Sequence, residues 1–229
     1  MRNINREGIP LQTNCIVIFS GGFDSTTLLY HLMGKKLAPA TITFRYGQRH
    51  DKEVKLALEH VTNLGLLHQV IDLTPLSDLW LTSSLIDHSL DIPAAMQVKT
   101  NEQPSTYVPN RNMLFLSLAI AWAETLGVKE VYYGAQKHDI YGYWDTTPEF
   151  VDHVNALYKL SPNYINVVAP FLNFSKADIL RIGLELGVDY SKTWSCYAGE
   201  EVACGICPTC VERVKAFETL GISDPIPYR

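Results

Sequence analysis

The chain has 229 residues, of which 47% are hydrophobic and 19% are charged, and its formal net charge is -5. This composition excludes an intrinsically disordered chain, and the length suits one large α/β domain because a single core grows to roughly 250 residues. The negative charge argues against a broad nucleic-acid-binding face, which needs clustered Lys and Arg. The N-terminus lacks the apolar segment of a signal peptide, and the longest apolar stretch, 113–123, is too short to span a bilayer. We expect a cytoplasmic protein without direct nucleic-acid or membrane partners.

Short β-type segments alternate with helical segments through most of the chain. The expected strands are 14–19, 40–45, 67–73, 130–134 and 164–168. The expected helices are 26–33, 50–64, 111–126, 148–160 and 175–186. This alternation predicts a three-layer α/β sandwich with a mainly parallel, Rossmann-like sheet of five strands. The polar stretch 87–109 has no clear period and is expected to be a functional loop or lid.

The first expected strand leads into a glycine-containing segment, Phe19-Ser20-Gly21-Gly22-Phe23-Asp24-Ser25-Thr26. The glycines let backbone N–H groups approach an anion closely, and Ser25 is placed to cap the following helix, whose positive end faces that anion. The segment lacks the Gly-Lys-Ser/Thr of the common ATPase loop and the Gly-x-Gly-x-x-Gly of dinucleotide sites. It predicts an anion cradle at the edge where open α/β sheets bind ligands, against the simpler alternative of an ordinary strand-to-helix turn.

Four of the five cysteines gather in one segment near the C-terminus: Cys196, Cys204, Cys207 and Cys210. Four thiolates at this spacing predict one structural zinc ion. An iron–sulfur cluster and a redox dithiol use the same residue type and stay open as alternatives. We expect residues 1–190 to form the catalytic domain and residues 191–229 to form a zinc-binding segment packed on it. The remaining Cys15 is expected to be a buried apolar residue of the first strand.

The pattern Ser-Gly-Gly-x-Asp-Ser resembles the pyrophosphate-binding loop of the adenylating ATP pyrophosphatases, the PP-loop superfamily with the adenine nucleotide alpha hydrolase-like fold. Further segments resemble one branch of it, the QueC family, and these are 46–50, 107–112, 139–145, 170–176, 194–197 and 224–225. The resemblance covers nearly the whole chain. It implies an ATP-dependent ligase that converts 7-carboxy-7-deazaguanine and ammonia into 7-cyano-7-deazaguanine, a queuosine precursor, through an adenylated carboxylate and an adenylated amide. It also implies, by analogy, a homodimer.

The same resemblance implies roles for individual residues, with Mg²⁺ accompanying ATP and oriented by Asp24. The residues expected to bind ATP are Phe19, Ser20, Gly21, Gly22, Asp24, Ser25, Thr26, Gln48 and His50. The residues expected to bind the deazaguanine are Arg111, Asp139, Gly142, Tyr143 and Asp145. The expected catalytic residues are Asp24, Lys176 and Arg111. For the lysine, the arginine and the two aspartates of the substrate loop, a solvated surface position is the simpler alternative.

One loop departs from the family pattern. Members often read Gly-Tyr-Pro-Asp-Cys, whereas this chain has Gly142-Tyr143-Trp144-Asp145-Thr146. Trp144 adds a large aromatic face, and Thr146 cannot act as a thiolate. The alternative function is therefore a relative that stops at the amide or joins the carboxylate to a protein amine. A tRNA-thiolating pyrophosphatase is not expected, because it would need a reactive cysteine, whereas four cysteines are assigned to a metal and Cys15 to a buried strand. An RNA-binding zinc knuckle is not expected either, because it would need a basic, aromatic surface.

Overall fold

The computed structural model describes residues 13–49, 51–99, 102–136 and 142–229. Five parallel strands form one sheet in the order β3-β2-β1-β4-β5. The strands are β1 (Cys15–Ile18), β2 (Pro39–Arg45), β3 (His68–Asp72), β4 (Glu130–Tyr132) and β5 (Asn166–Val168). The predicted parallel five-stranded sheet is confirmed, with the strand ends shifted by a few residues.

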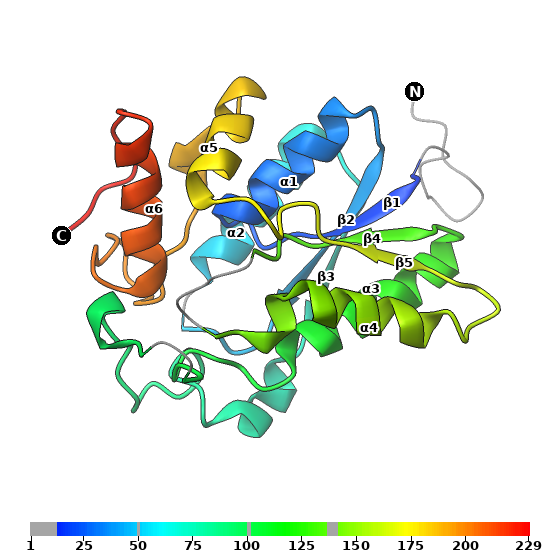
Figure 1. Ribbon diagram of the computed structural model, residues 1–229, viewed down its shortest axis with the longest axis horizontal. Coiled ribbons are helices and arrows are strands. Elements are labelled where there is room, and N and C mark those ends of the chain that lie inside the picture. Colours follow the sequence, from blue (N-terminus) through cyan, green and yellow to red (C-terminus); the bar gives the residue numbers. More distant parts are fainter. Residues whose placement is uncertain (1–12, 50, 100–101, 137–141) are drawn as a thin grey trace.

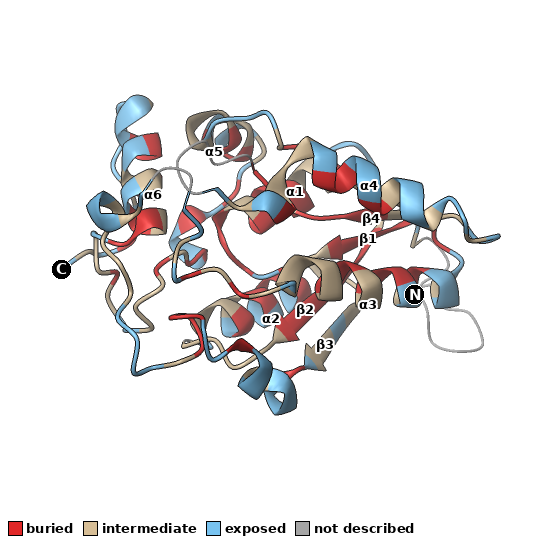
Figure 2. Cartoon of the chain, turned by 60° about the horizontal axis from the view of Figure 1, so that its bottom comes forward, coloured by how far each residue is buried: buried red, intermediate tan, exposed pale blue. Residues whose placement is uncertain are grey.

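Helices cover both faces of the sheet (Figure 1). They are α1 (Phe23–Gly34), α2 (Lys52–Leu64), α3 (Arg111–Leu126), α4 (Pro148–Tyr158), α5 (Lys176–Glu185) and α6 (Pro208–Thr219). The core on one face joins α1, α2 and α5, and the core on the other joins α3 and α4. Side chains alternate along β1, with Val17 in the first core and Ile16 in the second, as the pleat of a strand requires. In Figure 2, β1 and β2 are almost wholly buried and the helices are buried on the faces that turn toward the sheet, whereas β3 at the edge of the sheet has no buried residue.

The long connection between β3 and α3 contains two short 3-10 helices, Thr74–Trp80 and Ala95–Gln97, in an otherwise irregular course. The indole N–H of Trp80, which is buried, donates to the carbonyl of Pro109 at 3.0 Å and fixes this connection against the start of α3. The expected irregular loop is therefore present. Among the described helices, none combines the length and the apolar character required to cross a bilayer.

The start of α1 differs from the prediction. Gly22, in an extended conformation, is the N-cap, and the helix begins at Phe23 rather than at residue 26. The ring of Phe23 packs between Tyr190 and Phe217 at centroid distances of 4.6 and 6.3 Å, and this packing places Phe23 inside the first helical turn. The predicted capping role of Ser25 is wrong, since Ser25 lies within that turn. The predicted cap at Ser175 is confirmed, because its side chain accepts from the N–H of Asp178 in a capping box.

The C-terminal part contains α6, a helix that was not predicted, with Pro208 in its first turn. Phe217 joins the core formed by α1 and α5. The buried guanidinium of Arg213 forms two contacts with the Asp224 carboxylate, at 2.7 and 2.9 Å, and also donates to the carbonyl of Tyr190 at 2.9 Å. These contacts hold residues 191–229 on the main body. The expected division at residue 190 stays a prediction.

Candidate active site

A cavity of about 280 Å³ lies at the carboxyl ends of β1, β2 and β4. Within the sheet, β1 has two neighbours. The next strand in the sequence, β2, pairs with one edge of β1, and β4 pairs with its other edge. This is the switch point at which open α/β sheets leave a crevice for ligands. The cavity wall includes Ile18 at the end of β1, residues 19–20 and 22–25 after it, the end of β2, and Tyr133 to Gln136 after β4.

The segment between β1 and α1 forms a folded loop at the bottom of this cavity. Ser25 Oγ accepts from the N–H of Ser20 at 3.2 Å and lies 3.0 Å from Ser20 Oγ. Ser20 Oγ in turn accepts from the N–H of Gly22 at 3.2 Å. Because the first N–H groups of a helix have no intrahelical acceptors, those of Phe23, Asp24 and Ser25 face the loop with the positive end of the helix dipole. The arrangement suits a bound anion.

Two residues of the expected anion cradle, Gly21 and Thr26, do not line the cavity. Gly21 has a φ of +77°, and a Cβ atom at this position would lie 2.5 Å from the carbonyl oxygen of Glu53. Gly21 is therefore required by the close approach of α2. Thr26 is fully buried and does not line the cavity, although its Oγ1 has no hydrogen-bond partner among the described residues. The lining does include Phe19, Ser20, Gly22, Asp24 and Ser25.

Asp24 and Lys176 meet at the mouth of this loop. Lys176 Nζ donates to Asp24 Oδ2 at 2.6 Å, and the two side chains are only 14% and 24% exposed. The other carboxylate oxygen, Asp24 Oδ1, is buried and has no hydrogen-bond partner in the described parts of the chain. The simpler alternative for Lys176, a solvated lysine, is excluded by this burial. The pair presents one cation and one unsatisfied anionic oxygen to a ligand.

Arg111 begins α3 and lies at the centre of the cavity wall. Its Nη1 donates to the hydroxyl of Tyr46 at 3.1 Å, and the guanidinium lies 6.0 Å from the ring centroid of Phe115. Burial alone lowers the pKa of Arg111, but Tyr46 and the Asp145 carboxyl outweigh burial and raise this pKa. Burial raises the pKa of Asp145, and Arg111 opposes that shift. The cavity therefore holds a permanent cation beside a buried carboxyl group.

Two loops are joined along one side of the cavity. Thr106 Oγ1 and the Tyr143 hydroxyl are 2.7 Å apart, and the indole N–H of Trp144 donates to the Tyr107 hydroxyl at 2.8 Å. Tyr143 lines the cavity, whereas Gly142 is exposed and lies outside the lining. These contacts hold the stretch before α3 against the loop that contains Tyr143 and Trp144, whose sequence departs from the family pattern.

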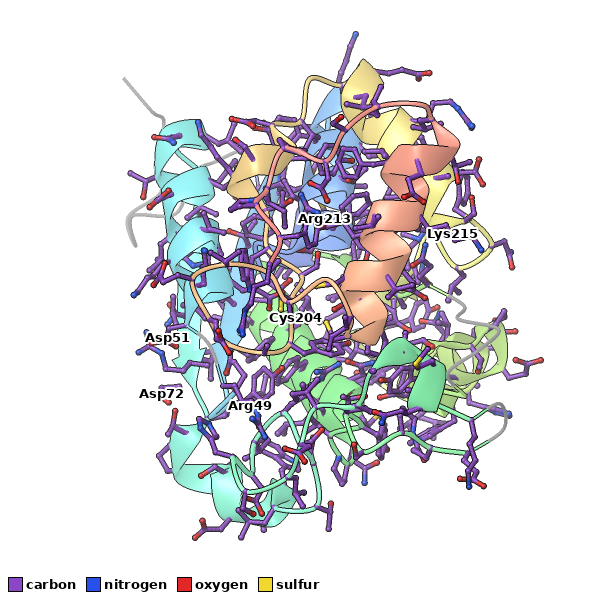
Figure 3. All side chains as sticks on the ribbon, turned by 90° about the vertical axis from the view of Figure 1, so that its left-hand side faces the viewer. Arg49, Asp51, Asp72, Cys204, Arg213 and Lys215 are labelled. Carbon is purple, nitrogen blue, oxygen red and sulfur yellow. The ribbon has the colours of Figure 1, made fainter. Side chains whose placement is uncertain are left out.

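The four cysteines of the C-terminal segment come together, with sulfur atoms that all lie within 4.8 Å of one another. Cys204 Sγ and Cys210 Sγ are 4.0 Å apart, close to the roughly 3.8 Å edge of a tetrahedron with metal–sulfur bonds of about 2.3 Å. The N–H groups of Ala198 and Cys204 donate to Cys196 Sγ at 3.4 and 3.3 Å, which favours thiolate. Figure 3 shows Cys204 in the loop before α6. The cluster fits a metal ion.

The cysteine cluster adjoins the cavity. Thr209, between two of the cysteines, donates from Oγ1 to the carbonyl of Ser195 at 2.6 Å. Ser195 and Thr209 both line the cavity, together with Trp194 and Tyr197. The Trp194 ring lies 3.7 Å from Lys52 Nζ. The cluster therefore fixes part of the cavity wall as well as the C-terminal tail.

The family model described as queuosine biosynthesis protein QueC matches residues 14–221. The chain belongs to the QueC family. A 7-cyano-7-deazaguanine synthase from Psychromonas ingrahamii is 47% identical over 215 residues, covering 93% of this chain and 96% of the relative. The corresponding enzyme from Marinomonas is 41% identical over 220 residues, with 95% and 99% covered.

The solved structures support the fold of this QueC chain. NMN synthetase from Francisella tularensis superimposes with a TM-score of 0.50 and 14% sequence identity, covering 93% of this chain and 79% of that one. At this identity the likeness concerns the fold alone. It agrees with the expected nucleotide hydrolase-like α/β sandwich.

Glu53, Tyr133 and Gln136 are among the cavity residues of the QueC chain that were not singled out from the sequence. Burial raises the pKa of Glu53 to about 8, against the opposing effect of Arg111. Burial and then Asp145 raise the pKa of Tyr133, whose hydroxyl has no partner among the described residues. Tyr133 and Gln136 directly follow β4, so the rule that ligands bind at carboxyl ends of strands could have found them.

The remaining expected site residues have separate outcomes. Gln48 lines the cavity, where its Oε1 accepts from the N–H of Tyr46 at 2.8 Å. His50 and Asp139 lie outside the described residues. Cys15 is fully buried in β1 as expected, and burial raises the pKa of its thiol to about 12.

Proposed function

We propose that the chain converts 7-carboxy-7-deazaguanine, ammonia and ATP into 7-cyano-7-deazaguanine, releasing AMP and pyrophosphate, as a step of queuosine precursor biosynthesis. The observation that carries this proposal is the pairing of Asp24 and Lys176 at 2.6 Å beside the N-terminus of α1, in a chain of the QueC family. The relatives are named 7-cyano-7-deazaguanine synthase, after the nitrile. This name favours the nitrile as the product over an amide or a protein conjugate.

The loop after β1 would hold the β and γ phosphates of ATP. Backbone N–H groups at the start of α1 and the Lys176 ammonium would contact the phosphate oxygens, which leaves the α phosphorus open to attack. Asp24 Oδ1, buried and unpartnered among the described residues, is a fitting ligand for Mg²⁺, which when bound would neutralise phosphate charge. Pyrophosphate is then a stabilised leaving group.

Arg111 would orient the substrate carboxylate toward that phosphorus. A carboxylate oxygen attacks the α phosphorus, the bond to pyrophosphate breaks, and an acyl adenylate forms. Ammonia then attacks the carbonyl carbon, AMP leaves with the former carboxylate oxygen, and one proton is lost from nitrogen. Guanidinium groups bind carboxylates in a bidentate manner, and Arg111 keeps its charge in this half-buried position.

The same cavity would serve a second round. The amide oxygen attacks the α phosphorus of a second ATP, and loss of AMP together with the remaining N–H protons forms the carbon–nitrogen triple bond. Each round therefore consumes one ATP and releases one AMP and one pyrophosphate. Activation by adenylation is required because neither a carboxylate nor an amide is a good electrophile.

The substrate ring would lie on the β4 side of the cavity. Asp145 is 3% exposed and offers its carboxyl group to the N–H groups of a guanine-type edge. Tyr143 lines the same wall, and Thr146 stands where the family often has cysteine. Since Thr146 Oγ1 donates to the Tyr143 carbonyl at 3.0 Å, its role here is to shape the loop.

The metal of the cysteine cluster is proposed to be one zinc ion. The ligands would be Cys196, Cys204, Cys207 and Cys210. Sulfur atoms this close together fit a single ion better than a multi-iron cluster, and four protein ligands leave no open position for catalysis. Its role would be structural. The homodimer and the absence of nucleic-acid partners stay predictions, which light scattering and RNA binding at varied salt would measure.

Product analysis tests the proposal. Purified protein is incubated with ATP, Mg²⁺, ammonia and 7-carboxy-7-deazaguanine, and the products are identified by mass spectrometry. We expect the nitrile, with AMP and pyrophosphate formed in equal amounts. Accumulation of the amide alone would support the alternative function, and ADP with orthophosphate would contradict adenylation.

A further inference from the structure

Gln136 carries a buried hydrogen-bond acceptor that has no partner. The residue is 4% exposed and lines the cavity just after β4. Its Nε2 donates to the backbone carbonyl of Phe174 at 3.2 Å. The Phe174 carbonyl oxygen is an acceptor, so its partner must be the NH2 group of the Gln136 side chain. This contact therefore fixes the orientation of the Gln136 amide. Within the described parts of the chain, Gln136 Oε1 is buried and unpartnered.

An unpaired oxygen in this position points to a ligand. Leaving a buried acceptor unsatisfied costs about 1–3 kcal/mol, and nearly all such atoms in proteins are paired. The amide oxygen can only accept, so its partner must be an N–H or O–H group. A triphosphate at neutral pH offers acceptors and negative charge, and its expected place is the loop after β1. The ribose and adenine of ATP and the ammonia also carry such donors, but Gln136 lines the cavity just after β4, on the side proposed for the substrate ring, so its partner is sought on that ring.

The substrate ring supplies more donors than one carboxylate can accept. A guanine-type edge presents one ring N–H and the two hydrogens of the 2-amino group. Asp145, buried in the same cavity, would accept two parallel hydrogen bonds with its two carboxylate oxygens and would leave the third hydrogen, which points away from it, unpaired. On the basis of the proposed function, we propose that Gln136 Oε1 accepts this hydrogen and determines specificity for a ring that carries the 2-amino group.

A double-mutant cycle between protein and substrate tests the proposal. The protein change is Gln136→Met, which keeps the length of the side chain and removes the acceptor. The substrate change is the use of 7-carboxy-7-deazahypoxanthine, which lacks the 2-amino group. We expect this substrate change to lower kcat/KM about 100-fold in the wild-type enzyme and about 10-fold or less in Gln136→Met. A loss of packing alone would lower kcat/KM for both substrates by the same factor.

Gln48→Met is the matched control, because this glutamine lines the same cavity but its Oε1 already accepts from the Tyr46 N–H at 2.8 Å. The control should keep the full wild-type preference for the 2-amino group. Equal losses in the wild-type enzyme and Gln136→Met, within about 2-fold, would overturn the proposal. Calorimetry of both substrates with the wild-type enzyme and with Gln136→Met gives four Kd values, and these complete the same double-mutant cycle without turnover. A failure of recognition is thereby distinguished from a failure of the proposed chemistry, which the nitrile assay reports.

Discussion

Lys176 Nζ, at the start of α5, lies 2.6 Å from Asp24 Oδ2 in the first turn of α1, although 152 positions separate the two residues in the chain. The contact brings two helix N-termini together beside the loop after β1. A cation and two positive helix ends therefore surround one carboxylate, and the whole group favours an additional anion.

Lys176→Met and Asp24→Asn are each expected to lower kcat for AMP formation about 100-fold or more, since the first removes a cation beside the reacting phosphates and the second removes the proposed ligand of Mg²⁺. Steady-state assays of pyrophosphate release measure the effect. Lys35→Ala, a change of an exposed lysine just after α1, is the control and should retain wild-type activity. Comparable activity of Lys176→Met and wild type would remove Lys176 from the phosphate site.

Glu53 predicts a pH dependence of stability. Burial raises its pKa from 4.5 to about 8, so the folded state binds a proton that the unfolded state has released between these values. The stability associated with the neutral carboxyl is present below about pH 4.5 and is lost as the pH rises to about 8. Glu53→Gln should therefore be more stable than wild type at pH 8, by roughly 1–3 kcal/mol.

Thermal melts without nucleotide, compared across pH, measure this difference. We expect the Tm advantage of Glu53→Gln to shrink toward pH 4.5 and to level off above about pH 8. Glu59→Gln, at an exposed position of the same helix, is the control and should show no such trend. A constant Tm difference at all pH values would mean that Glu53 is not neutral in the folded protein.

The ion pair between Arg213 and Asp224 predicts a large loss of stability when one partner is removed. Their side chains are 1% and 6% exposed, so Asp224→Ala leaves a buried charge uncompensated and should cost about 3–5 kcal/mol in urea unfolding. Arg181→Ala breaks an exposed pair and should cost no more than about 0.5 kcal/mol. Equal costs for the two changes would contradict the anchoring of the C-terminal segment through Arg213.

Metal removal should affect both the C-terminal segment and the cavity wall. Cys204→Ala is expected to abolish binding of about one zinc ion per chain and to lower Tm by about 10 °C, which corresponds to a loss of roughly 2.5–5 kcal/mol because each kcal/mol shifts Tm by about 2–4 °C at this size. Cys15→Ala, which changes the cysteine of β1, should retain the metal. Metal content by mass spectrometry and melting curves test this. Full metal content in Cys204→Ala would contradict the ligand assignment.

Much of this fold could be predicted because local patterns agree with the tertiary structure. Alternating strands and helices, Pro148 in the first turn of α4 and Ser175 at the cap of α5 each have short-range causes. The cysteine cluster was predictable for the same reason, since its four ligands are close in the sequence. The start of α1 could not be predicted in this way. Phe23 belongs to the first turn because its ring packs against Phe217, a residue distant in the chain.

The site was only partly predictable. Gly21 belongs to a recognisable motif, yet its backbone is fixed by the approach of Glu53, a contact that no motif reports. Tyr133 and Gln136 could have been placed at the ligand edge by their position after the fourth strand, but only the folded chain reveals that each has a buried polar atom without a partner among the described residues. Side-chain burial depends on all elements together, so a linear pattern cannot supply it.

Oxygen transfer tests the central claim most directly. The substrate is prepared with heavy oxygen in both positions of its carboxylate, and the AMP released during conversion is analysed by mass spectrometry. Since each round moves one of these oxygens to the α phosphorus, the account predicts that every AMP carries one heavy oxygen and that two such AMP molecules form per nitrile. Unlabelled AMP, or heavy oxygen recovered in orthophosphate beside ADP, would contradict adenylation in this cavity.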